Sequence, residues 1–226
     1  MRIGILGGTF NPIHCGHLHI AEQTRTRLEL NQILFIPTGD PPHKPAESLA
    51  PAHHRLEMVK LATKDFPHFR VSDIEATSSQ TCYTIDTLHA LKSQIKGELF
   101  FLVGLDAFLD LPTWKASDQL LAETNFVVIS RPEVQFSQIK SLAMVPSIIS
   151  ISEEDLAAID KGQQDHLEIP ISDQTTLTLL ALPPCKISAS TIRDRLHQGL
   201  SVGDWLPAPI ESYIIEHHLY RTEKGV

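Results

Sequence analysis

Short apolar runs alternate along this chain with longer stretches in which apolar residues recur among polar ones. Runs of the first kind are typical of buried strands, and stretches of the second kind are typical of amphipathic helices. The pattern predicts strands over residues 2–6, 32–37, 69–73, 99–103 and 126–130. It predicts helices over residues 16–30, 52–65, 84–95, 188–198 and 210–218.

Strands that alternate with helices of about ten to fifteen residues indicate βαβ units and a parallel sheet covered on both faces. Right-handed crossovers make a doubly wound, Rossmann-like α/β sheet the expected architecture. The length of 226 residues and the apolar share of 42% suit a single domain over residues 1–226. Within it, residues 133–176 are interpreted as a surface excursion, and the last two predicted helices as closing helices.

The charge and cysteine content narrow the possible partners and the compartment. A formal net charge of −8 disfavours broad binding to nucleic acid or to an anionic membrane. Cys15, Cys82 and Cys185 are far apart and odd in number, which does not suggest a disulfide framework. No apolar run approaches membrane-spanning length, and residues 1–6 are too short for a secretory signal. We therefore expect a cytoplasmic protein.

Two glycines and two histidines lie within the segment GGTFNPIHCGH, directly after the first predicted strand. Ligands bind beyond the carboxyl ends of strands in this architecture, and Gly7 and Gly8 let the backbone approach an anion closely. His14 and His17 are three residues apart, so at a helix N-terminus they point the same way. The free N–H groups there favour negative charge. The segment predicts a phosphate site, although it matches neither the P-loop nor the dinucleotide-binding spacing.

Two other interpretations of this segment remain open. One is a structural glycine turn with one histidine capping the helix and the other exposed. The other is a metal site formed by His14, Cys15, His17 and His19. The metal interpretation is disfavoured because Cys15 is adjacent to His14, and because His19 leaves the helix face that His14 and His17 share. We assign no metal ligand to the protein.

The segment resembles the GGTFDPIHxGH signature of bacterial nicotinate-nucleotide adenylyltransferases, within the nucleotidyltransferase superfamily marked by HxGH. Asn11 stands where that signature more commonly has Asp. A second superfamily signature, close to ISxSxIR, is present as Ile187-Ser188-Ala189-Ser190-Thr191-Ile192-Arg193. Further matching pieces follow the expected order: Pro41-Pro42-His43-Lys44, Tyr83-Thr84-Ile85-Asp86-Thr87-Leu88, Gly104-Leu105-Asp106, Trp114, Tyr213-Ile214 and Leu219-Tyr220. The ordered set covers almost the whole chain apart from residues of about 133–176.

The resemblance implies transfer of AMP from ATP to nicotinic acid mononucleotide, which gives deamido-NAD and pyrophosphate in NAD biosynthesis. The attacking phosphate oxygen is already ionised at neutral pH, so catalysis depends on positioning and on charge stabilisation. Mg²⁺ is expected to bind through the ATP phosphates. A different HxGH transferase, such as phosphopantetheine adenylyltransferase or a cytidylyltransferase, is the nearer alternative, and a non-catalytic nucleotide sensor is the more distant one.

The resemblance also implies roles for individual residues. His17 stabilises the α-phosphate in the transition state, His14 grips the triphosphate, and Arg193 holds its outer oxygens bidentately. These three form the catalytic set. The ATP-binding residues are Gly7, Gly8, Thr9, Phe10, His14, His17, Gly104, Asp106, Ile187, Ser188, Ser190 and Arg193. The residues that bind the mononucleotide are Lys44, Tyr83, Thr84 and Trp114.

Several of these residues also have a purely structural interpretation. Asp106 either accepts hydrogen bonds from a ribose or caps the next helix. Trp114 either stacks on the pyridine ring near Tyr83-Thr84 or packs in the core. Arg193 and Lys44 are commonly solvated residue types, whereas Ser188 or Ser190 can cap the helix that carries Arg193.

The adjacent pairs His53-His54 and His217-His218 are expected to be ordinary surface histidines. Adjacent residues on a helix point about 100° apart, so neither pair converges on one ion.

Overall fold

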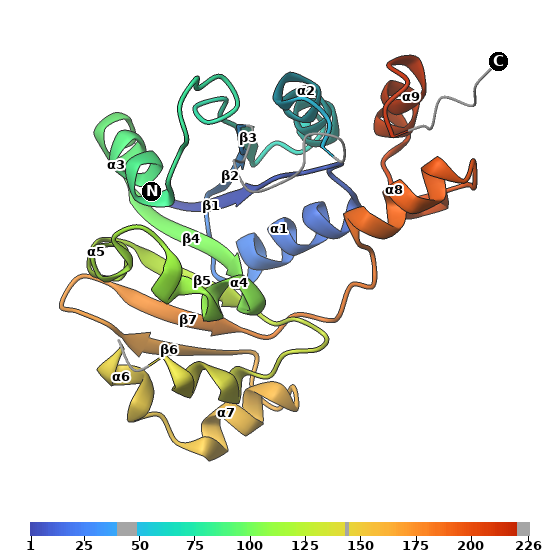
Figure 1. Ribbon diagram of the computed structural model, residues 1–226. Coiled ribbons are helices and arrows are strands. Elements are labelled where there is room, and N and C mark those ends of the chain that lie inside the picture. Colours follow the sequence, from blue (N-terminus) through green and yellow to red (C-terminus); the bar gives the residue numbers. More distant parts are fainter. Residues whose placement is uncertain (40–48, 143–144, 221–226) are drawn as a thin grey trace. The chain divides into compact units, whose positions relative to one another are not determined.

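The computed structural model describes residues 1–39, 49–142 and 145–220 (Figure 1). The described chain forms two compact units, each assembled from three segments. Unit 1 consists of Met1–Leu6, Thr26–Asn31 and Tyr83–Cys185. Unit 2 consists of Gly7–Arg25 and the described parts of Gln32–Cys82 and Lys186–Val226. The single-domain organisation stays a prediction.

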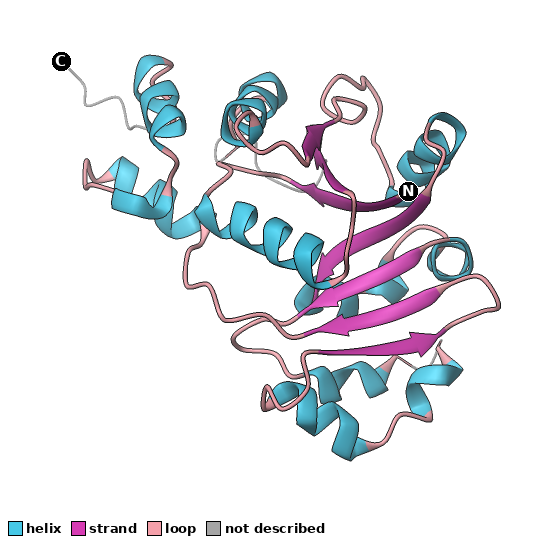
Figure 2. Ribbon diagram, turned by 180° about the vertical axis from the view of Figure 1, so that it is seen from behind, coloured by secondary structure: helices cyan, strands magenta, loops and turns pink. Residues whose placement is uncertain are grey.

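Unit 1 is built around five adjacent strands, in the order β1 (Arg2–Gly8), β4 (Glu98–Gly104), β5 (Asn125–Ile129), β7 (Thr176–Leu180) and β6 (His166–Pro170). Of β1, the residues up to Leu6 belong to this unit. Each neighbouring pair is parallel except β7 and β6, where the arrow of the edge strand is reversed (Figure 2). The register places Phe101 beside Phe126, and Phe126 beside Leu177. All five residues of β5 are buried, as expected for a parallel strand covered on both faces.

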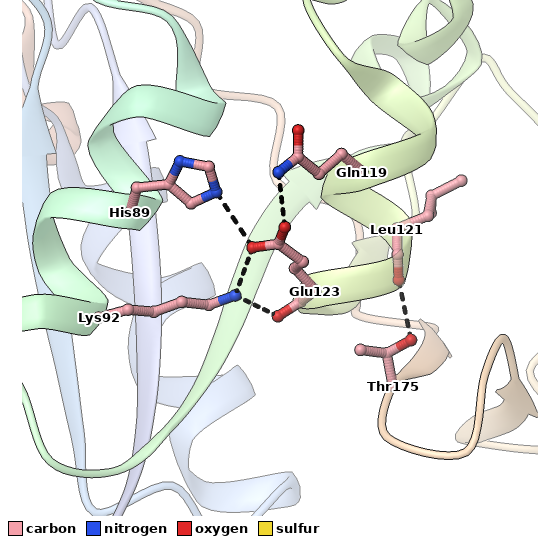
Figure 3. Close-up of polar contacts among 6 residues, drawn as sticks. All are labelled: His89, Lys92, Gln119, Leu121, Glu123 and Thr175. Carbon is pink, nitrogen blue, oxygen red and sulfur yellow. Dashed lines mark hydrogen bonds and ion pairs between the residues drawn. The ribbon is translucent and has the colours of Figure 1, made fainter.

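The helices of unit 1 are α3 (Thr84–Gln94), α4 (Leu105–Leu109), α5 (Ser117–Glu123), α6 (Pro146–Ile149) and α7 (Glu153–Asp160). Glu123 joins α3 to α5, because its carboxylate accepts hydrogen bonds from His89 (3.0 Å), Lys92 (3.2 Å) and Gln119 (2.7 Å) (Figure 3). The bonds from Gln119, Lys92 and His89 lower the pKa of Glu123. Thr175, in the loop before β7, donates to the carbonyl of Leu121 (2.8 Å) and so connects that loop to α5.

Residues 133–176 have a buried apolar interior of their own. They form a 3₁₀ helix (Phe136–Ser141), α6, α7 and β6. The carboxylate of Asp160, at the end of α7, accepts the backbone N–H of Phe136 (2.8 Å). The buried side chains are Phe136, Ile139, Leu142, Val145, Ile148, Leu156, Ile159 and Ile169. The segment therefore supplies an antiparallel edge strand as well as surface, and the hydrophobic pattern predicted neither β6 nor β7.

Unit 2 contains two parallel strands, β2 (Gln32–Pro37) and β3 (Phe69–Val71), with Ile33 beside Phe69. The helix α2 (Ala52–Thr63) packs against both strands and against α9 (Ala208–Glu216). The other helices that the structure describes in unit 2 are α1 (Cys15–Arg27), which belongs to this unit up to Arg25, α8 (Ala189–His197) and a 3₁₀ helix (Gly203–Trp205). No helix in the described ranges is both long and apolar enough to cross a membrane.

Every strand and helix predicted from the sequence is present, with ends that shift by at most a few residues. The largest shift is at the end of α1, which stops at Arg27, and Glu29 takes a left-handed conformation (φ 51°) shortly after it. A left-handed residue just past a helix is a common way to end it. The predicted α/β class with a mostly parallel sheet is therefore confirmed.

Candidate active site

The loop after β1 is shaped by the aromatic ring of Phe10. Gly8 ends the strand, and a Cβ there would lie 3.2 Å from Cζ of Phe10, closer than such contacts normally come. The absence of a side chain at Gly8 thus lets the buried ring fold back over the strand end. The centroid of that ring lies 5.9 Å from the centroid of Phe35 and 5.1 Å from that of His17, with the Phe10 and His17 rings in a T-shaped arrangement. The Asn11–Pro12 peptide bond that follows is cis.

The two histidines of the motif stack on each other at the start of α1. The carbonyl of His14 accepts the N–H of His17 (2.9 Å), and the two ring centroids are 3.7 Å apart. The backbone N–H of His14 also donates to Nδ1 of His17 (3.2 Å). Because an amide N–H can only donate, a neutral His17 ring carries its proton on Nε2. The predicted common direction of the two rings is confirmed, and neutral His17 has a defined donor atom.

The helix α8 brings Arg193 to the same loop. Its N-cap is Ser188, whose Oγ accepts the N–H of Thr191 (3.2 Å), whereas Ser190 lies inside the helix. Of the two serines proposed as caps, Ser188 fills that role. Arg193 is half-buried and donates through Nη1 to the backbone carbonyl of Asn11 (2.8 Å). The interpretation of Arg193 as a solvated surface charge is therefore wrong.

A pocket of about 250 Å³ lies in unit 2 between these elements. It is lined by Thr9, Phe10, Asn11, His17, Leu49, Ala189 and Arg193. The structure thus brings four of the predicted ATP-binding residues together, and His14 is stacked on His17. Ligand pockets commonly enclose about 300–1,000 Å³. This pocket lies just below that range, and an imidazole and a guanidinium are the ionisable groups that line it.

Asn11 connects three distant segments at this pocket. Its side-chain Oδ1 accepts hydrogen bonds from the backbone N–H of Ala50 (3.0 Å) and from the hydroxyl of Tyr220 (2.7 Å). Its carbonyl accepts the bond from Arg193 described above. Burial raises the pKa of Tyr220, against the opposing effects of Arg193 and Arg55, so the hydroxyl keeps its proton.

Sequence reasoning missed Arg55, which is completely buried in α2. Its guanidinium donates to the carbonyls of Ala50 (2.8 Å), Thr9 (2.8 Å), Thr38 (2.7 Å) and Gly39 (2.7 Å). These bonds hold the loop after β1 and the loop after β2. A signal was present in the sequence, because Arg55 stands at helical spacing from apolar core positions: Ala52, Met58, Val59 and Ala62.

Gly104 and Asp106, two further predicted ATP-binding residues, lie in unit 1. Gly104 ends β4 and is the N-cap of α4, so the interpretation of Asp106 as the cap of this helix is wrong. Asp106 is exposed, and its Oδ1 accepts a hydrogen bond from Nε of Arg131 (3.1 Å). A side chain at Gly104 would collide with both partners of this ion pair. Arg131 is a second residue that sequence reasoning missed.

The predicted mononucleotide-binding residues that the structure describes also lie in unit 1. Tyr83 is the N-cap of α3, makes no side-chain cap bond and is 46% exposed, so its ring can contact a ligand. Nζ of Lys115 lies 4.5 Å from the centroid of that ring and 2.8 Å from Oδ2 of Asp86. Trp114 is half-buried, with its ring edge-on to Phe101 at 6.1 Å. Thr84 is the first residue of α3, and Lys44 lies outside the described residues.

The expectation of ordinary surface histidines is wrong for His54. His54 is half-buried and lies on α2, which packs against α9. Its Nδ1 is 2.9 Å from the hydroxyl of Tyr213 on α9. Its ring centroid is 4.1 Å from that of His53 and 5.0 Å from that of His217. Burial, together with the charges of His53 and His217, lowers the pKa of His54. Within the described parts of the chain, no group of three or more His, Cys, Asp or Glu residues could hold a metal ion.

Comparison with known proteins gives one consistent result. Residues 5–195 match the model of the cytidylyltransferase-like family. The chain is 38% identical over 228 residues to the "Probable nicotinate-nucleotide adenylyltransferase" of Geobacter metallireducens, covering 99% of this chain and 100% of that protein. It is 39% identical over 223 residues to the protein of the same name from Dehalococcoides mccartyi, covering 97% of each.

The fold also resembles that of the Plasmodium falciparum nicotinic acid mononucleotide adenylyltransferase complexed with NaAD. The TM-score is 0.70, with 20% identity and 97% of each chain covered. The fold and the loop after β1 define a cytidylyltransferase-like α/β protein. Within that class, the chain belongs to the family of nicotinate-nucleotide adenylyltransferases, and the resemblance found in the sequence is confirmed.

Proposed function

We propose that this protein transfers the adenylyl group of ATP to nicotinic acid mononucleotide, producing deamido-NAD and pyrophosphate for NAD biosynthesis. The observation that carries the proposal is the pocket at the loop after β1, where the HxGH histidine His17 and the ISxSxIR arginine Arg193 line one cavity. Membership of the nicotinate-nucleotide adenylyltransferase family supports the choice of acceptor.

The chemistry suits a site made of donors and cations. An oxygen of the 5′-phosphate of the mononucleotide attacks the α-phosphorus of ATP, and the bond from that phosphorus to the oxygen bridging to the β-phosphate breaks. Pyrophosphate leaves with the bonding electrons. The nucleophile is already an anion, so no side chain has to remove a proton from it. The protein has to orient the reacting groups and stabilise the negative charge that develops on them.

His17 and Arg193 have complementary roles in this proposal. Nε2–H of His17 donates to an α-phosphate oxygen, and the stacked ring of His14 keeps His17 in its orientation. Arg193 binds the β- and γ-oxygens, and its bond to Asn11 fixes where the guanidinium lies. Donors that are held in place before the reaction cost no reorganisation when charge develops.

The other predicted residues are proposed to hold the rest of the two substrates. Gly7 and Gly8, at the end of β1, and Thr9 and Phe10, in the loop after it, are proposed to lie beside the phosphates. Ile187, Ser188 and Ser190 flank the start of α8, and Gly104 and Asp106 are proposed to contact the ribose. Tyr83, Thr84 and Trp114 are proposed to bind the pyridine ring, and Lys44 to bind phosphate. Partners of this kind are small nucleotides, and neither nucleic acid nor a membrane is proposed.

Mg²⁺ is proposed as an ion bound through the phosphates of ATP. The residues that line the pocket include an imidazole and a guanidinium but no carboxylate. Mg²⁺ prefers oxygen ligands and retains water readily. The hydrogen-bond donors of the pocket therefore suit phosphate oxygens. The same oxygens can coordinate Mg²⁺, which screens their negative charge. We also propose a cytoplasmic location, because three cysteines that are far apart in the sequence do not suggest a disulfide framework.

The test is a comparison of acceptors in the presence of Mg²⁺, with ATP as the donor unless another is named. Pyrophosphate release and the nucleotide product are measured with nicotinic acid mononucleotide, phosphopantetheine and phosphocholine, the last with CTP as donor. We expect release of pyrophosphate with the first acceptor and formation of deamido-NAD in equal amount. Turnover with another acceptor alone, or ATP binding without turnover, would overturn the proposal.

A further inference from the structure

The described chain ends at a tyrosine that the proposed chemistry does not use. The helix α9 ends at Glu216, and His218 and Tyr220 then take left-handed conformations, with φ of 53° and 58°. The N–H of Leu219 donates to the carbonyl of Ile214 (3.0 Å), which closes this turn. The turn directs Tyr220 to the loop after β1, where its hydroxyl donates to Oδ1 of Asn11 (2.7 Å).

Asn11 transmits this contact to the pocket. Its side chain is 7% exposed, and Oδ1 already accepts the N–H of Ala50 (3.0 Å), so the hydroxyl of Tyr220 completes a pair of bonds to one oxygen. These two bonds fix the plane of the side-chain amide. They also fix the position of the Asn11 backbone, whose carbonyl accepts Nη1 of Arg193 (2.8 Å).

Arg193 depends on that carbonyl for its orientation. A guanidinium has five N–H donors in a rigid plane. A bond from Nη1 to a fixed carbonyl sets the direction in which the remaining donors point. Since Arg193 and Asn11 both line the pocket, a shift of the carbonyl moves the donors relative to any phosphate bound there. A shift of this carbonyl can therefore change phosphate binding while the fold of the protein stays intact.

We propose that Tyr220 is a positioning residue for adenylyl transfer, which acts through Asn11 to hold Arg193 in the orientation that binds the triphosphate. This inference rests on the proposed function and goes beyond it, because Tyr220 does not line the pocket. Burial raises the pKa of the Tyr220 hydroxyl, so it serves as a donor at neutral pH. Asn11 is well suited to this arrangement, since its neutral side chain accepts both bonds without placing a negative charge near the phosphates.

The experiment compares two tyrosines that each lose one hydroxyl. Tyr220→Phe removes the bond to Asn11. Tyr213→Phe is the matched control, because it removes a hydroxyl from α9 that bonds to Nδ1 of His54 (2.9 Å) and not to Asn11. KM for ATP, KM for the mononucleotide, kcat and the thermal midpoint are measured for each. We expect Tyr220→Phe to raise KM for ATP about five-fold, the usual effect of one hydrogen bond. KM for the mononucleotide should stay within about two-fold of wild type, and Tyr213→Phe should leave both values unchanged.

A double mutant separates positioning from general stability. In an Arg193→Ala background, Tyr220→Phe should not raise KM for ATP further, because the group that it orients is gone. An independent five-fold rise in that background would overturn the inference. So would equal increases in both KM values, or a lower thermal midpoint with an unchanged KM for ATP.

The inference can fail separately from the proposed function. The Kd for ATP, measured by titration calorimetry without an acceptor, does not require turnover. A wild type that binds ATP but makes no product would overturn the proposed function, and the Kd of Tyr220→Phe would then test the positioning role alone. An unchanged Kd would overturn that role, and a five-fold weaker Kd would support it.

Discussion

Replacement of Arg55 by Met should be among the most destabilising single changes in this protein. The side chain is completely buried and donates to four backbone carbonyls, those of Ala50, Thr9, Thr38 and Gly39. Methionine fills a similar volume but offers no donor, so the change tests the hydrogen bonds rather than the packing. A bond to a charged group contributes about 1.5–3 kcal/mol, which gives an upper bound of about 6–12 kcal/mol for four.

The observed loss should be smaller than this bound. Once the loops relax, their carbonyls can form hydrogen bonds with water. The variant also has no charged guanidinium to bury, so the unfavourable desolvation of that charge is absent. Removing one partner of a buried charged network typically costs about 3–5 kcal/mol. We expect a loss of this size in the free energy of unfolding. Since domains are commonly stable by only about 5–15 kcal/mol, the variant should remain folded at low temperature, but its free energy of unfolding should be small.

Urea unfolding followed by circular dichroism measures this loss. Arg25→Met is the matched control, because Arg25 also lies on a helix but forms a partly exposed pair with Glu22 at 2.6 Å. Partly exposed pairs of this kind contribute about 0–1 kcal/mol, and the control should lose no more. Arg55→Lys keeps the charge but lacks the planar fork, and should lose an intermediate amount. A loss at Arg55→Met no greater than at Arg25→Met would refute the view that these carbonyl bonds stabilise the two loops.

Three further outcomes are expected. His17→Ala should lower kcat by about 10²–10³ with the fold intact, the usual loss for one transition-state donor; a kcat within a few-fold of wild type in steady-state assays contradicts the role. Nicotinic acid mononucleotide should exceed its amide counterpart at least about 10²-fold in kcat/KM, because first-turn N–H groups near Tyr83 and Thr84 suit a carboxylate and not an NH₂ group; comparable efficiencies in parallel assays would count against backbone donors there. Glu123→Gln should lower the free energy of unfolding by less than about 1 kcal/mol at pH 7. The pKa of Glu123 is lowered in the folded state, so this difference is present above the ordinary glutamate pKa of about 4.3 and disappears as the pH falls through the lowered value. Urea titrations at several pH values check this, and a difference that grows towards acid pH has the wrong sign.

Local patterns in the sequence specified most of the secondary structure. Continuous apolar runs such as 99–103 and 126–130 identified buried parallel strands, since both faces of such strands are covered. The strand β6 escaped prediction because most of its residues are exposed at the sheet edge. Its partner β7 carries two threonines among its leucines, which shortens the apolar run.

The candidate site divides in the same way between local and distant information. The three-residue spacing of His14 and His17 was enough to predict that their rings share one side of a helix start, because that geometry is local. The sequence likewise predicted a serine cap at Ser188 or Ser190, and the structure shows that Ser188 is the cap. The partners of Asn11 and Arg55 were not predictable, although the spacing of Arg55 from apolar core positions indicates its burial. Asn11 meets Arg193 across 182 positions of sequence and Tyr220 across 209.

The sequence by itself determined the class of fold, the family and the position of the loop that carries His14 and His17. The tertiary structure alone decided which carbonyls Arg55 holds, which atom of Asn11 receives Tyr220, and how Arg193 is oriented. Hydrophobic periodicity reports burial along one element, and a motif reports residues that are neighbours along the chain. A hydrogen bond between a side chain and a distant backbone carbonyl produces neither a periodic pattern nor a motif. Every residue presents the same carbonyl, so the sequence does not indicate which one will accept the bond.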